Sequence, residues 1–249
     1  MAETALAVRG LRKAFGALIV SDAVDLDVCT GECHALIGPN GAGKTTILAQ
    51  LAGELPPDAG TIRFRDRDVT RLGPDARARL GIARSFQITT LVGDFTAEDN
   101  VALAVQARDA TVMRFWQAAR RDMALREPAR AALARVGLGA RAQIRAADLA
   151  HGEQRLLELA IALAQTPAVL LLDEPMAGLG HDESRAMIAL LREIKPSVAM
   201  LLIEHDMDAI AELADRVTVL VAGRAIASGP YAAIRNDPRV RDAYLGEDG

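Results

Sequence analysis

A continuous apolar segment, Cys33–Ile37, runs directly into a glycine-rich stretch and then into a helical pattern. His34 is the single polar residue of that segment, as expected for a strand buried on both faces of a sheet. The stretch 38–46 reads Gly-Pro-Asn-Gly-Ala-Gly-Lys-Thr-Thr, and 47–49 continue as Ile-Leu-Ala. This strand–loop–helix order contains the spacing G-x-x-x-x-G-K-[ST]. It favours an α/β fold whose glycine loop lies at the end of a buried strand.

The residue types of this loop match the chemistry of phosphate binding. Glycines allow backbone N–H groups to turn inward around phosphate oxygens, and the start of a helix adds a positive dipole. We expect Lys44 to neutralise the β- and γ-phosphates, Thr45 to ligate Mg²⁺ and Thr46 to contact the α-phosphate. A chance glycine-rich turn is the alternative, which the flanking strand and helix disfavour. The predicted nucleoside triphosphate site comprises Gly38, Pro39, Asn40, Gly41, Ala42, Gly43, Lys44, Thr45 and Thr46.

Two carboxylates follow another apolar strand. Val169–Leu172 is a continuous apolar run, and Asp173 and Glu174 come directly after it. A carboxylate at the carboxyl end of a buried strand is placed to serve Mg²⁺ beside a phosphate loop. We therefore expect Asp173 to hold Mg²⁺, through water, and Glu174 to polarise the attacking water as a general base. Considered alone, Glu174 would be interpreted as a solvated acid beside a turn.

His205 follows a third apolar strand, Ala199–Ile203. It is the only one of the four histidines that sits just past the carboxyl end of a predicted strand. A histidine there can hydrogen-bond the γ-phosphate and the catalytic water. A surface histidine without a role is the alternative.

Strand patterns occur at both ends of the chain, whereas its middle is helical. Further predicted strands are Val24–Val28, Thr61–Phe64, Val217–Val221 and Arg224–Ala227. Ala222-Gly223, between the last two, is typical of a hairpin turn. Ala97–Arg145 is rich in Ala, Leu and Arg and lacks a convincing strand, so several short helices are expected there. The pattern predicts a strand-rich α/β core interrupted by a helical insertion.

Composition excludes several classes of protein. The 249 residues carry 29 basic and 33 acidic side chains, a net charge of −4, which argues against a nucleic-acid partner. The longest apolar runs, such as Val198–Ile203, are far shorter than the roughly 20 residues of a membrane span. Two cysteines are too few for a disulfide framework, and the first residues lack a signal-peptide pattern. A cytoplasmic protein is expected.

Five motifs occur in one order along the chain: the phosphate loop, Gln87 in Arg-Ser-Phe-Gln, the segment 149–155 (Leu-Ala-His-Gly-Glu-Gln-Arg), the pair Asp173-Glu174, and His205. In this order they resemble the ATP-binding subunit of an ABC transporter over essentially the whole chain. The resemblance implies a P-loop NTPase (RecA-like) core with an N-terminal antiparallel β-subdomain and an inserted helical subdomain. It also implies a single domain over 1–249, with the α/β core at about 1–90 and 165–249 and the helical subdomain at 91–164.

The resemblance implies roles that spacing alone does not give. Phe15 matches the aromatic residue that stacks on adenine, with an ordinary core phenylalanine as the alternative. Gln87 matches the residue that reaches Mg²⁺ and the catalytic water and senses the membrane partner. Ala150, Gly152 and Gln154 belong to a signature-like segment that would bind the γ-phosphate of ATP held by a second subunit. Two ATP molecules would then be sandwiched between two ATPase chains.

Finer features resemble the ATPases of branched-chain amino acid importers, specifically their LivG type. These features are the stretches 82–89, 151–155 and 236–246. The resemblance implies ATP and Mg²⁺ as cofactors and a second ATPase subunit, either another copy or a LivF-like chain. It also implies integral membrane permease subunits, indirectly a solute-binding protein, and a position on the inner face of the cell membrane. The same family serves urea, amides and other small polar solutes, so the cargo stays open.

Two positions depart from the family pattern. Ala150 stands where the family usually has the signature serine, so one hydroxyl donor to the γ-phosphate of the other subunit is absent. Backbone N–H groups near Gly152 remain, and we expect a weakened site that still functions. Gly180 stands where Asp or Asn is common, which would loosen communication between the two ATP sites. The residues of this chain's own catalytic half-site are all present.

Other residues have simpler interpretations. Cys33 and His34 point to opposite sides of one strand, so buried free thiols, Cys29 included, are favoured over a metal site. The segment 91–95 (Leu-Val-Gly-Asp-Phe) matches the family's groove for a short helix of the membrane subunit, with core packing as the alternative. Two other functions are alternatives to the importer ATPase. One is an ABC-type ATPase of assembly or regulation without a permease; the other is a nucleotide-gated subunit whose partner does most of the hydrolysis.

Overall fold

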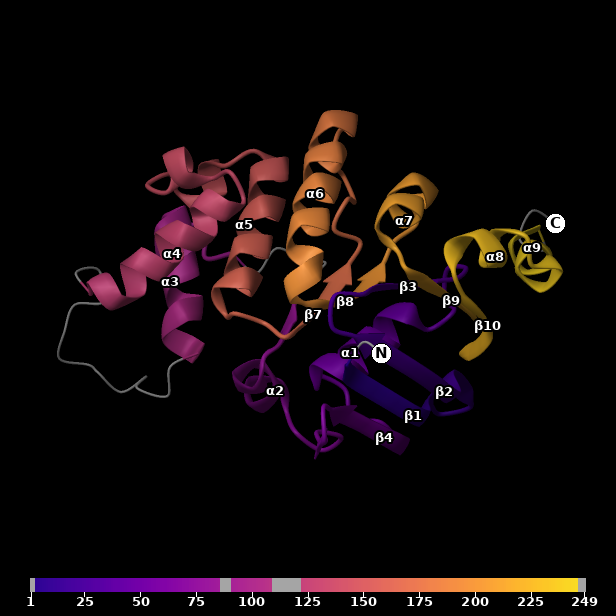
Figure 1. Cartoon of the computed structure of the whole chain (residues 1–249). Helices are drawn as coiled ribbons and strands as arrows, with labels where there is room; N and C mark the ends of the chain where they lie inside the picture. The colour runs from indigo at the N-terminus through magenta and orange to yellow at the C-terminus, as the bar shows by residue number, and fades with distance from the viewer. Residues whose placement is uncertain (1–2, 86–90, 109–121, 246–249) are drawn as a thin grey trace.

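The computed structural model describes residues 3–85, 91–108 and 122–245 (Figure 1). Its strands are β1 (Thr4–Phe15), β2 (Leu18–Cys29), β3 (Cys33–Ile37), β4 (Ala59–Phe64), β5 (Arg67–Asp68), β6 (Ile82–Arg84), β7 (Val169–Asp173), β8 (Ala199–Ile203), β9 (Arg216–Val221) and β10 (Arg224–Gly229). Its α-helices are α1 (Lys44–Ala52), α2 (Pro74–Leu80), α3 (Ala97–Arg108), α4 (Met123–Arg135), α5 (His151–Ala164), α6 (His181–Ile194), α7 (Met207–Leu213), α8 (Tyr231–Arg235) and α9 (Pro238–Leu245). Short 3-10 helices span Gly139–Arg141, Ala146–Asp148 and Lys195–Ser197.

A six-stranded sheet in the order β10-β9-β3-β8-β7-β6 forms the centre of the fold. Its described pairings are parallel except for β10 with β9. Strands β3, β7 and β8 are buried along their whole length, which explains why the sequence shows them as continuous apolar runs. Because these strands are parallel, their carboxyl ends meet at one edge, and the loops that follow them lie side by side.

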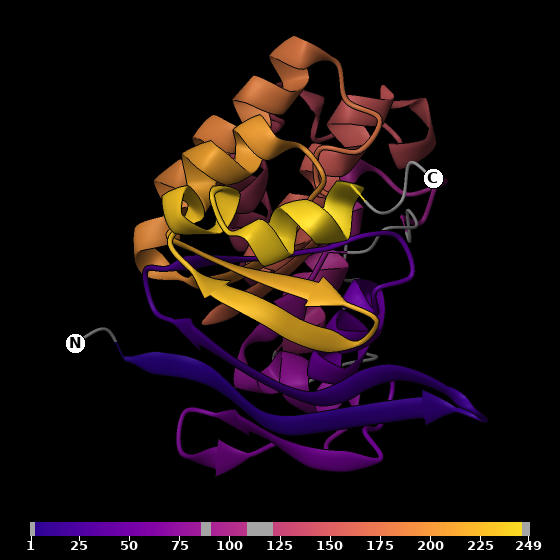
Figure 2. The ribbon, with the colours of Figure 1, turned by 90° about the vertical axis from the view of Figure 1, so that its right-hand side faces the viewer.

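Successive residues of the central strands face two different cores. Leu170 and Leu172 of β7 pack with helices α3, α4, α5 and α6, whereas Val169 and Leu171 pack with α1 and the N-terminal strands. The alternation follows from the two-residue period of a strand. Figure 1 shows the resulting layers, with α5, α6 and α7 on one face of the sheet and α1, β1, β2 and β4 on the other. A third cluster joins α7, α8 and α9 to β9 and β10, and Figure 2 shows α8 and α9 crossing that hairpin.

The N-terminal strands form a separate four-stranded sheet in the order β2-β1-β4-β5. All of its pairings are antiparallel, so the expected N-terminal antiparallel β-subdomain is confirmed. Strand β1 was not among the strands predicted from the pattern. Gly10, at φ 58°, lies between the paired residues Val8 and Leu11, where the register shifts. This irregularity interrupts the alternation of apolar and polar residues.

The middle of the chain is helical, as predicted. Helices α3, α4 and α5 contribute Val101, Leu133 and Leu157 to one core that continues onto the sheet. The described part of 97–145 contains helices and no strand, apart from one isolated bridge between Thr96 and Arg145. Among the described residues, no helix is both long and apolar enough to cross a membrane.

Several predicted strand ends agree with the structure. Strands β3 and β8 have the predicted bounds, and β7 extends one residue further, to Asp173. The predicted hairpin turn joins β9 to β10, with φ 45° at Ala222 and φ 79° at Gly223. Positive φ at both central residues is the geometry of a type I′ turn.

A buried arginine fixes the end of helix α1, the helix that carries the phosphate loop. Arg77 of α2 is 1% exposed, and its guanidinium donates hydrogen bonds to the carbonyl oxygens of Gln50, Leu51, Leu72 and Thr70 at 2.6–3.0 Å. Burial lowers the pKa of Arg77 to about 10. Because the last carbonyls of a helix lack partners within the helix, Arg77 supplies the cap that α1 needs.

Candidate nucleotide site

The predicted phosphate loop joins β3 to α1 and depends on two glycines. Gly38 has φ 152° and Gly43 has φ 103°, values that L side chains rarely adopt. A Cβ at Gly38 would clash with the carbonyl oxygen of Leu220, and one at Gly43 with that of Val20. The loop is therefore held between the sheet and strand β2. Gly43 is also the N-cap residue of α1, so the start of that helix faces the loop.

Lys44 lies inside this loop. Its side chain is 7% exposed, and Nζ donates hydrogen bonds to the carbonyl oxygens of Gly38, at 2.6 Å, and Pro39, at 3.0 Å. The ammonium group is thus held at the centre of the turn where a phosphate is expected. Thr45 is exposed and Thr46 is half-buried.

Asp173 ends β7 and is paired in register with Ile203 of β8. Its side chain is fully buried, and Arg84 donates a 2.9 Å hydrogen bond to Oδ2. Oδ1 is buried and has no hydrogen-bond partner among the described residues. Burial raises the pKa of Asp173, an effect that Arg84 opposes. A buried carboxylate with one free oxygen is suited to a cation.

Glu174 and His205 meet across the same edge of the sheet. His205 Nε2 lies 3.1 Å from Glu174 Oε1, and both side chains are partly accessible to solvent. Glu174 has φ 48°, a left-handed conformation that is strained for a residue with a side chain. Such strain occurs at functional sites, where the surrounding structure maintains it. The amide of Glu174 donates to the carbonyl oxygen of Ile203 at 2.9 Å, which holds the strained residue in place.

A buried acid that was not predicted from the sequence organises these two loops. Glu204 is 5% exposed, and its Oε1 accepts a 3.0 Å hydrogen bond from the amide of Met176. Its Oε2 accepts hydrogen bonds from the amides of His205, at 2.8 Å, and Asp206, at 3.3 Å. Glu204 therefore ties the turn after Glu174 to the turn that carries His205. The available signal was its place directly after a continuous apolar strand.

Phe15 lies at the end of β1, in the hairpin with β2. It is 52% exposed, which excludes the interpretation as an ordinary core phenylalanine. Lys13 Nζ lies 5.6 Å from the centre of its ring. The carbonyl oxygen of Val20, further along the same hairpin, lies close to Gly43 of the phosphate loop. The exposed ring is thus carried by a strand pair that touches the loop.

The signature-like segment forms the first turn of α5. Ala150 is its N-cap residue, and the amide of Ala150 donates a 3.0 Å hydrogen bond to Oε2 of Glu153. Gln154 Nε2 donates to the carbonyl oxygen of Ala146 at 3.0 Å, and a Cβ on Gly152 would clash with Glu183 of α6. These contacts are within the helical part and with α6 rather than with the phosphate loop. The segment therefore does not complete the site formed by Lys44 and Asp173 of the same chain.

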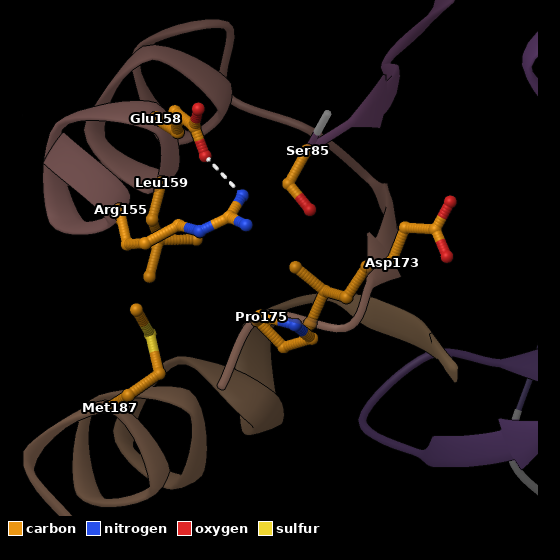
Figure 3. Close-up of a pocket in the computed structure, with 8 residues that line it drawn as sticks. Ser85, Arg155, Glu158, Leu159, Asp173, Pro175 and Met187 are labelled. Carbon is orange, nitrogen blue, oxygen red and sulfur yellow. Dashed lines mark hydrogen bonds and ion pairs between the residues drawn. The ribbon is translucent and has the colours of Figure 1, made fainter. Parts of the chain in front are cut away.

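Gln87 lies outside the described residues, so its predicted contact with Mg²⁺ and water has no structural description. Ser85, the last described residue before Gln87, lines a small cavity of about 10 Å³ together with Asp173 (Figure 3). Figure 3 shows Arg155 and Glu158 of α5 on the other side of this cavity, joined by a 3.1 Å ion pair. The cavity has room for about one water molecule and is too small for a nucleotide.

The residues at the carboxyl edge of the sheet suit Mg²⁺, which needs few protein ligands, better than a metal ion that is held by protein side chains alone. Among the described residues, no group of three or more His, Cys, Asp and Glu side chains is arranged to hold a metal ion. Mg²⁺ commonly uses one or two protein oxygens together with phosphates and water. The free Oδ1 of Asp173 and the exposed Thr45 provide such oxygens.

Cys29, Cys33 and His34, the residues considered for a different metal site, are buried. Cys29 and Cys33 are free and buried, and burial raises the pKa of Cys33 to about 12. His34 is buried, with Nδ1 2.7 Å from the carbonyl oxygen of Asp27 and Nε2 2.8 Å from Thr218 Oγ1. Both cysteines are buried free thiols, as predicted.

The segment 91–95 is partly packed against the core and partly exposed. Leu91 packs against the core, whereas Val92 is 42% and Phe95 37% exposed. The side-chain amide of Asn100 in α3 accepts a 2.9 Å hydrogen bond from the amide of Val92 and donates a 3.1 Å hydrogen bond to its carbonyl oxygen. Two apolar side chains are thus presented to solvent by a braced turn.

Comparison with known proteins agrees with this geometry. The profile described as ABC transporter matches residues 21–177, and the profile described as branched-chain amino acid ATP-binding cassette transporter matches residues 226–249. The chain belongs to the ABC transporter family. This ABC ATPase is 37% identical to the high-affinity branched-chain amino acid transport ATP-binding protein LivG of Salmonella typhimurium, over 99% of this chain and 100% of that protein. BraF of Pseudomonas aeruginosa has the same role in its name and is also 37% identical, over 99% and 100% of the two chains.

Solved structures support the fold of this ABC ATPase. An ATP-binding cassette of an ABC transporter in its ADP conformation superposes with a TM-score of 0.86 at 26% identity, covering 98% of this chain and 99% of that one. The predicted P-loop NTPase fold is confirmed, and so is the similarity to the LivG type. The ABC ATPase is a nucleotide-binding subunit of the kind that works within a transporter.

Proposed function

We propose that this ABC ATPase hydrolyses ATP to drive an importer for branched-chain amino acids or related small polar solutes. The observation that carries the proposal is the meeting of Lys44, Asp173 and the Glu174–His205 pair at the carboxyl edge of one parallel sheet. This edge is where α/β proteins bind nucleotides. The names of the LivG and BraF relatives support the cargo class.

Within this proposal, the residues of the edge have separate roles. Lys44 and the backbone amides of the loop bind the β- and γ-phosphates, and Phe15 stacks on adenine. Glu174 polarises the attacking water, and His205, in contact with Glu174, orients that water and the γ-phosphate. Asp173, Thr45 and Gln87 hold Mg²⁺, which neutralises charge on the phosphates when bound.

A second ATPase subunit completes each site in this proposal. The signature-like segment of one chain, at the start of α5, binds the γ-phosphate held by the other chain. Ala150 lacks the hydroxyl of the usual serine, but the free amides at a helix start still favour an anion. The residues 91–164 are proposed as the helical subdomain that carries this segment, inserted into an α/β core of 1–90 and 165–249. ATP then joins two chains, and hydrolysis releases them.

The proposed partners follow from the same arrangement. The second ATPase is a LivF-like chain or another copy of this one, and permease subunits in the membrane receive the motion. Val92 and Phe95 form the proposed contact with a permease helix, because they are exposed apolar side chains on a braced turn. The chain is proposed to lie on the cytoplasmic face of the membrane, with a solute-binding protein acting on the far side.

A second candidate is favoured by Ala150 and Gly180. If both weaken the composite sites, this chain binds nucleotide as a gating subunit while a partner ATPase does most of the hydrolysis. The two functions differ in what inactivation of this chain does to the complex. In the proposed function, Lys44→Ala in this chain removes a large part of the turnover of the complex.

The proposal is tested with the complete complex reconstituted in vesicles. Uptake of leucine and ATP hydrolysis are measured together, with wild-type chain and with Lys44→Ala. We expect Lys44→Ala to abolish nucleotide binding by this chain and to lower both rates together. Full nucleotide affinity in Lys44→Ala would refute the phosphate-loop assignment. Uptake of urea or an amide in place of leucine would revise the cargo alone.

A further inference from the structure

Arg84 links two acids that lie on opposite sides of it. It is the last residue of β6, and its side chain is 10% exposed. One guanidinium nitrogen, Nη1, forms an ion pair with Glu54 in the turn after α1. The other, Nη2, donates the 2.9 Å hydrogen bond to Oδ2 of Asp173. The planar guanidinium is therefore held at both nitrogens, by the turn after α1 on one side and by the end of β7 on the other.

The contact leaves Asp173 with one oxygen engaged and one free. Oδ2 is held by Arg84, whereas Oδ1 is buried without a hydrogen-bond partner among the described residues. Backbone pairing of Arg84 with Leu171 fixes the distance between β6 and β7. A carboxylate with one oxygen hydrogen-bonded to a neighbour keeps a defined orientation of the other oxygen. Arg84 thus determines which atom of Asp173 is presented to a cation.

The charges of this group also favour a cation. Glu54 and Asp173 carry two negative charges, and Arg84 carries one positive charge, so the three side chains have a net charge of −1. Removal of Arg84 would leave two negative charges and a stronger electrostatic attraction for a divalent ion, so a loss of Mg²⁺ affinity in its absence would report orientation of Asp173 rather than charge. Without Glu54, the Arg84–Asp173 pair would be neutral and less attractive to Mg²⁺.

We propose that Arg84, anchored by Glu54, is a positioning residue that sets the affinity of this ABC ATPase for Mg²⁺ by holding Asp173. The inference rests on the proposed function. It predicts that loss of Arg84 weakens Mg²⁺ binding while leaving the contact of Lys44 with phosphate in place. Outer residues that orient a metal ligand change metal affinity by about 10- to 100-fold.

The test measures Mg²⁺ and nucleotide binding separately on the full chain. Fluorescence of N-methylanthraniloyl-ADP reports nucleotide affinity in EDTA, and a titration with Mg²⁺ at fixed nucleotide gives the half-saturating Mg²⁺ concentration. For Arg84→Met we expect that concentration to rise about tenfold or more. Nucleotide affinity in EDTA should stay within about twofold of wild type, because Lys44 and the loop glycines are unchanged.

Two further variants distinguish the positioning role of Arg84 from misfolding and from the general loss of a charged side chain. Glu54→Ala removes the ion pair that anchors Arg84 but keeps Arg84 itself and its contact with Asp173. The half-saturating Mg²⁺ concentration should therefore rise less than in Arg84→Met. Arg126→Met is the matched control, because Arg126 is 9% exposed and pairs with Glu98 and Asp99 in the helical part. It should lower the melting temperature without changing the Mg²⁺ titration. Circular dichroism compares the folded content of all three variants.

The outcomes separate this inference from the proposed function. An unchanged or lower half-saturating Mg²⁺ concentration in both Arg84→Met and Glu54→Ala would overturn the positioning role. An equal loss of nucleotide affinity in EDTA would overturn it as well, since Arg84 would then support the whole loop. If the wild-type chain binds nucleotide with no response to Mg²⁺, the proposed function itself fails.

Discussion

His205 Nε2 lies 3.1 Å from Glu174 Oε1, and this contact joins the ends of two neighbouring parallel strands. Glu174 reaches it from a left-handed backbone conformation, with φ 48°. Glu204 fixes both turns by accepting backbone hydrogen bonds from Met176, His205 and Asp206. The pair is thus held by the backbone of two strands, so substitution of one member should leave the position of the other largely unchanged.

Substitution of His205 tests whether the pair acts in hydrolysis. For His205→Ala we expect the ATP turnover of the complex to fall by about 10²-fold or more, because the group that orients the water and the γ-phosphate is lost. ATP affinity should change only a few-fold, since Lys44 and the phosphate loop remain. His181→Ala is the control, because His181 is exposed at the start of α6. Turnover in His205→Ala equal to that in His181→Ala would rule out the role.

Restoring the signature hydroxyl should strengthen the composite site. In Ala150→Ser the new hydroxyl caps α5 and gains a donor for the γ-phosphate of the other subunit. A hydrogen bond to a charged group is worth about 1.5 kcal/mol or more, which corresponds to about tenfold or more tighter ATP-dependent association of the subunits. Sedimentation of the subunits with ATP measures this association.

Ala150→Asp separates the two effects of that substitution. Aspartate also caps a helix, so the melting temperature should rise as in Ala150→Ser. Its negative charge repels the γ-phosphate, so ATP-dependent association should weaken. An equal gain of association in both variants would show that the benefit comes from the helix cap alone.

His34 should make stability depend on pH. The carbonyl of Asp27 can only accept, so Nδ1 carries the proton and Nε2 accepts from the Thr218 hydroxyl. Burial lowers the pKa of His34 from 6.5. Because the unfolded chain takes up this proton more readily, the free energy of unfolding falls as pH drops below about 6.5, until the folded pKa is passed.

The corresponding measurement is urea unfolding between pH 7.5 and pH 5. The quantity compared is the slope of the free energy of unfolding against pH. His34→Gln should flatten the loss of stability, which for a single proton is at most about 1.4 kcal/mol per pH unit. His181→Gln, at an exposed position, should keep the wild-type slope. If His34→Gln also keeps that slope, the acid sensitivity comes from other groups.

Arg77 should be important for the stability of the phosphate-loop helix. In Arg77→Met the carbonyl oxygens of Gln50, Leu51, Leu72 and Thr70 lose their donor in a buried place. We expect the free energy of unfolding to fall by about 2–4 kcal/mol. Arg79→Met, on the exposed side of the same helix, should change it by less than about 0.5 kcal/mol. Equal effects in denaturant titrations would contradict the capping role.

The parts of the fold that the sequence predicts well are those with a local cause. Cys33–Ile37 and Ala199–Ile203 are apolar throughout because both of their faces are covered, and their bounds agree with β3 and β8. The phosphate loop was predicted because its glycines are required by positive φ at close contacts. Strand β1 was not predicted because the irregularity at Gly10 interrupts its alternation of apolar and polar residues.

The contacts that sequence reasoning missed are long-range. Arg84 and Asp173 are 89 residues apart, and Glu204 holds Met176 from a distance of 28 residues. Each depends on which strands become neighbours in the sheet, and no local spacing contains that information. Arg84 was visible in the sequence only as the residue three positions before Gln87.

Glu174→Gln in the assembled complex tests the catalytic assignment at the centre of this proposal. The variant keeps the size and the hydrogen-bonding capacity of the side chain but removes the carboxylate that polarises water. With Mg²⁺ and ATP we predict ATP binding at wild-type affinity, a stable closed pair of ATPase subunits, and turnover lowered by about 10²-fold or more. Turnover at the wild-type rate in Glu174→Gln would contradict the assignment.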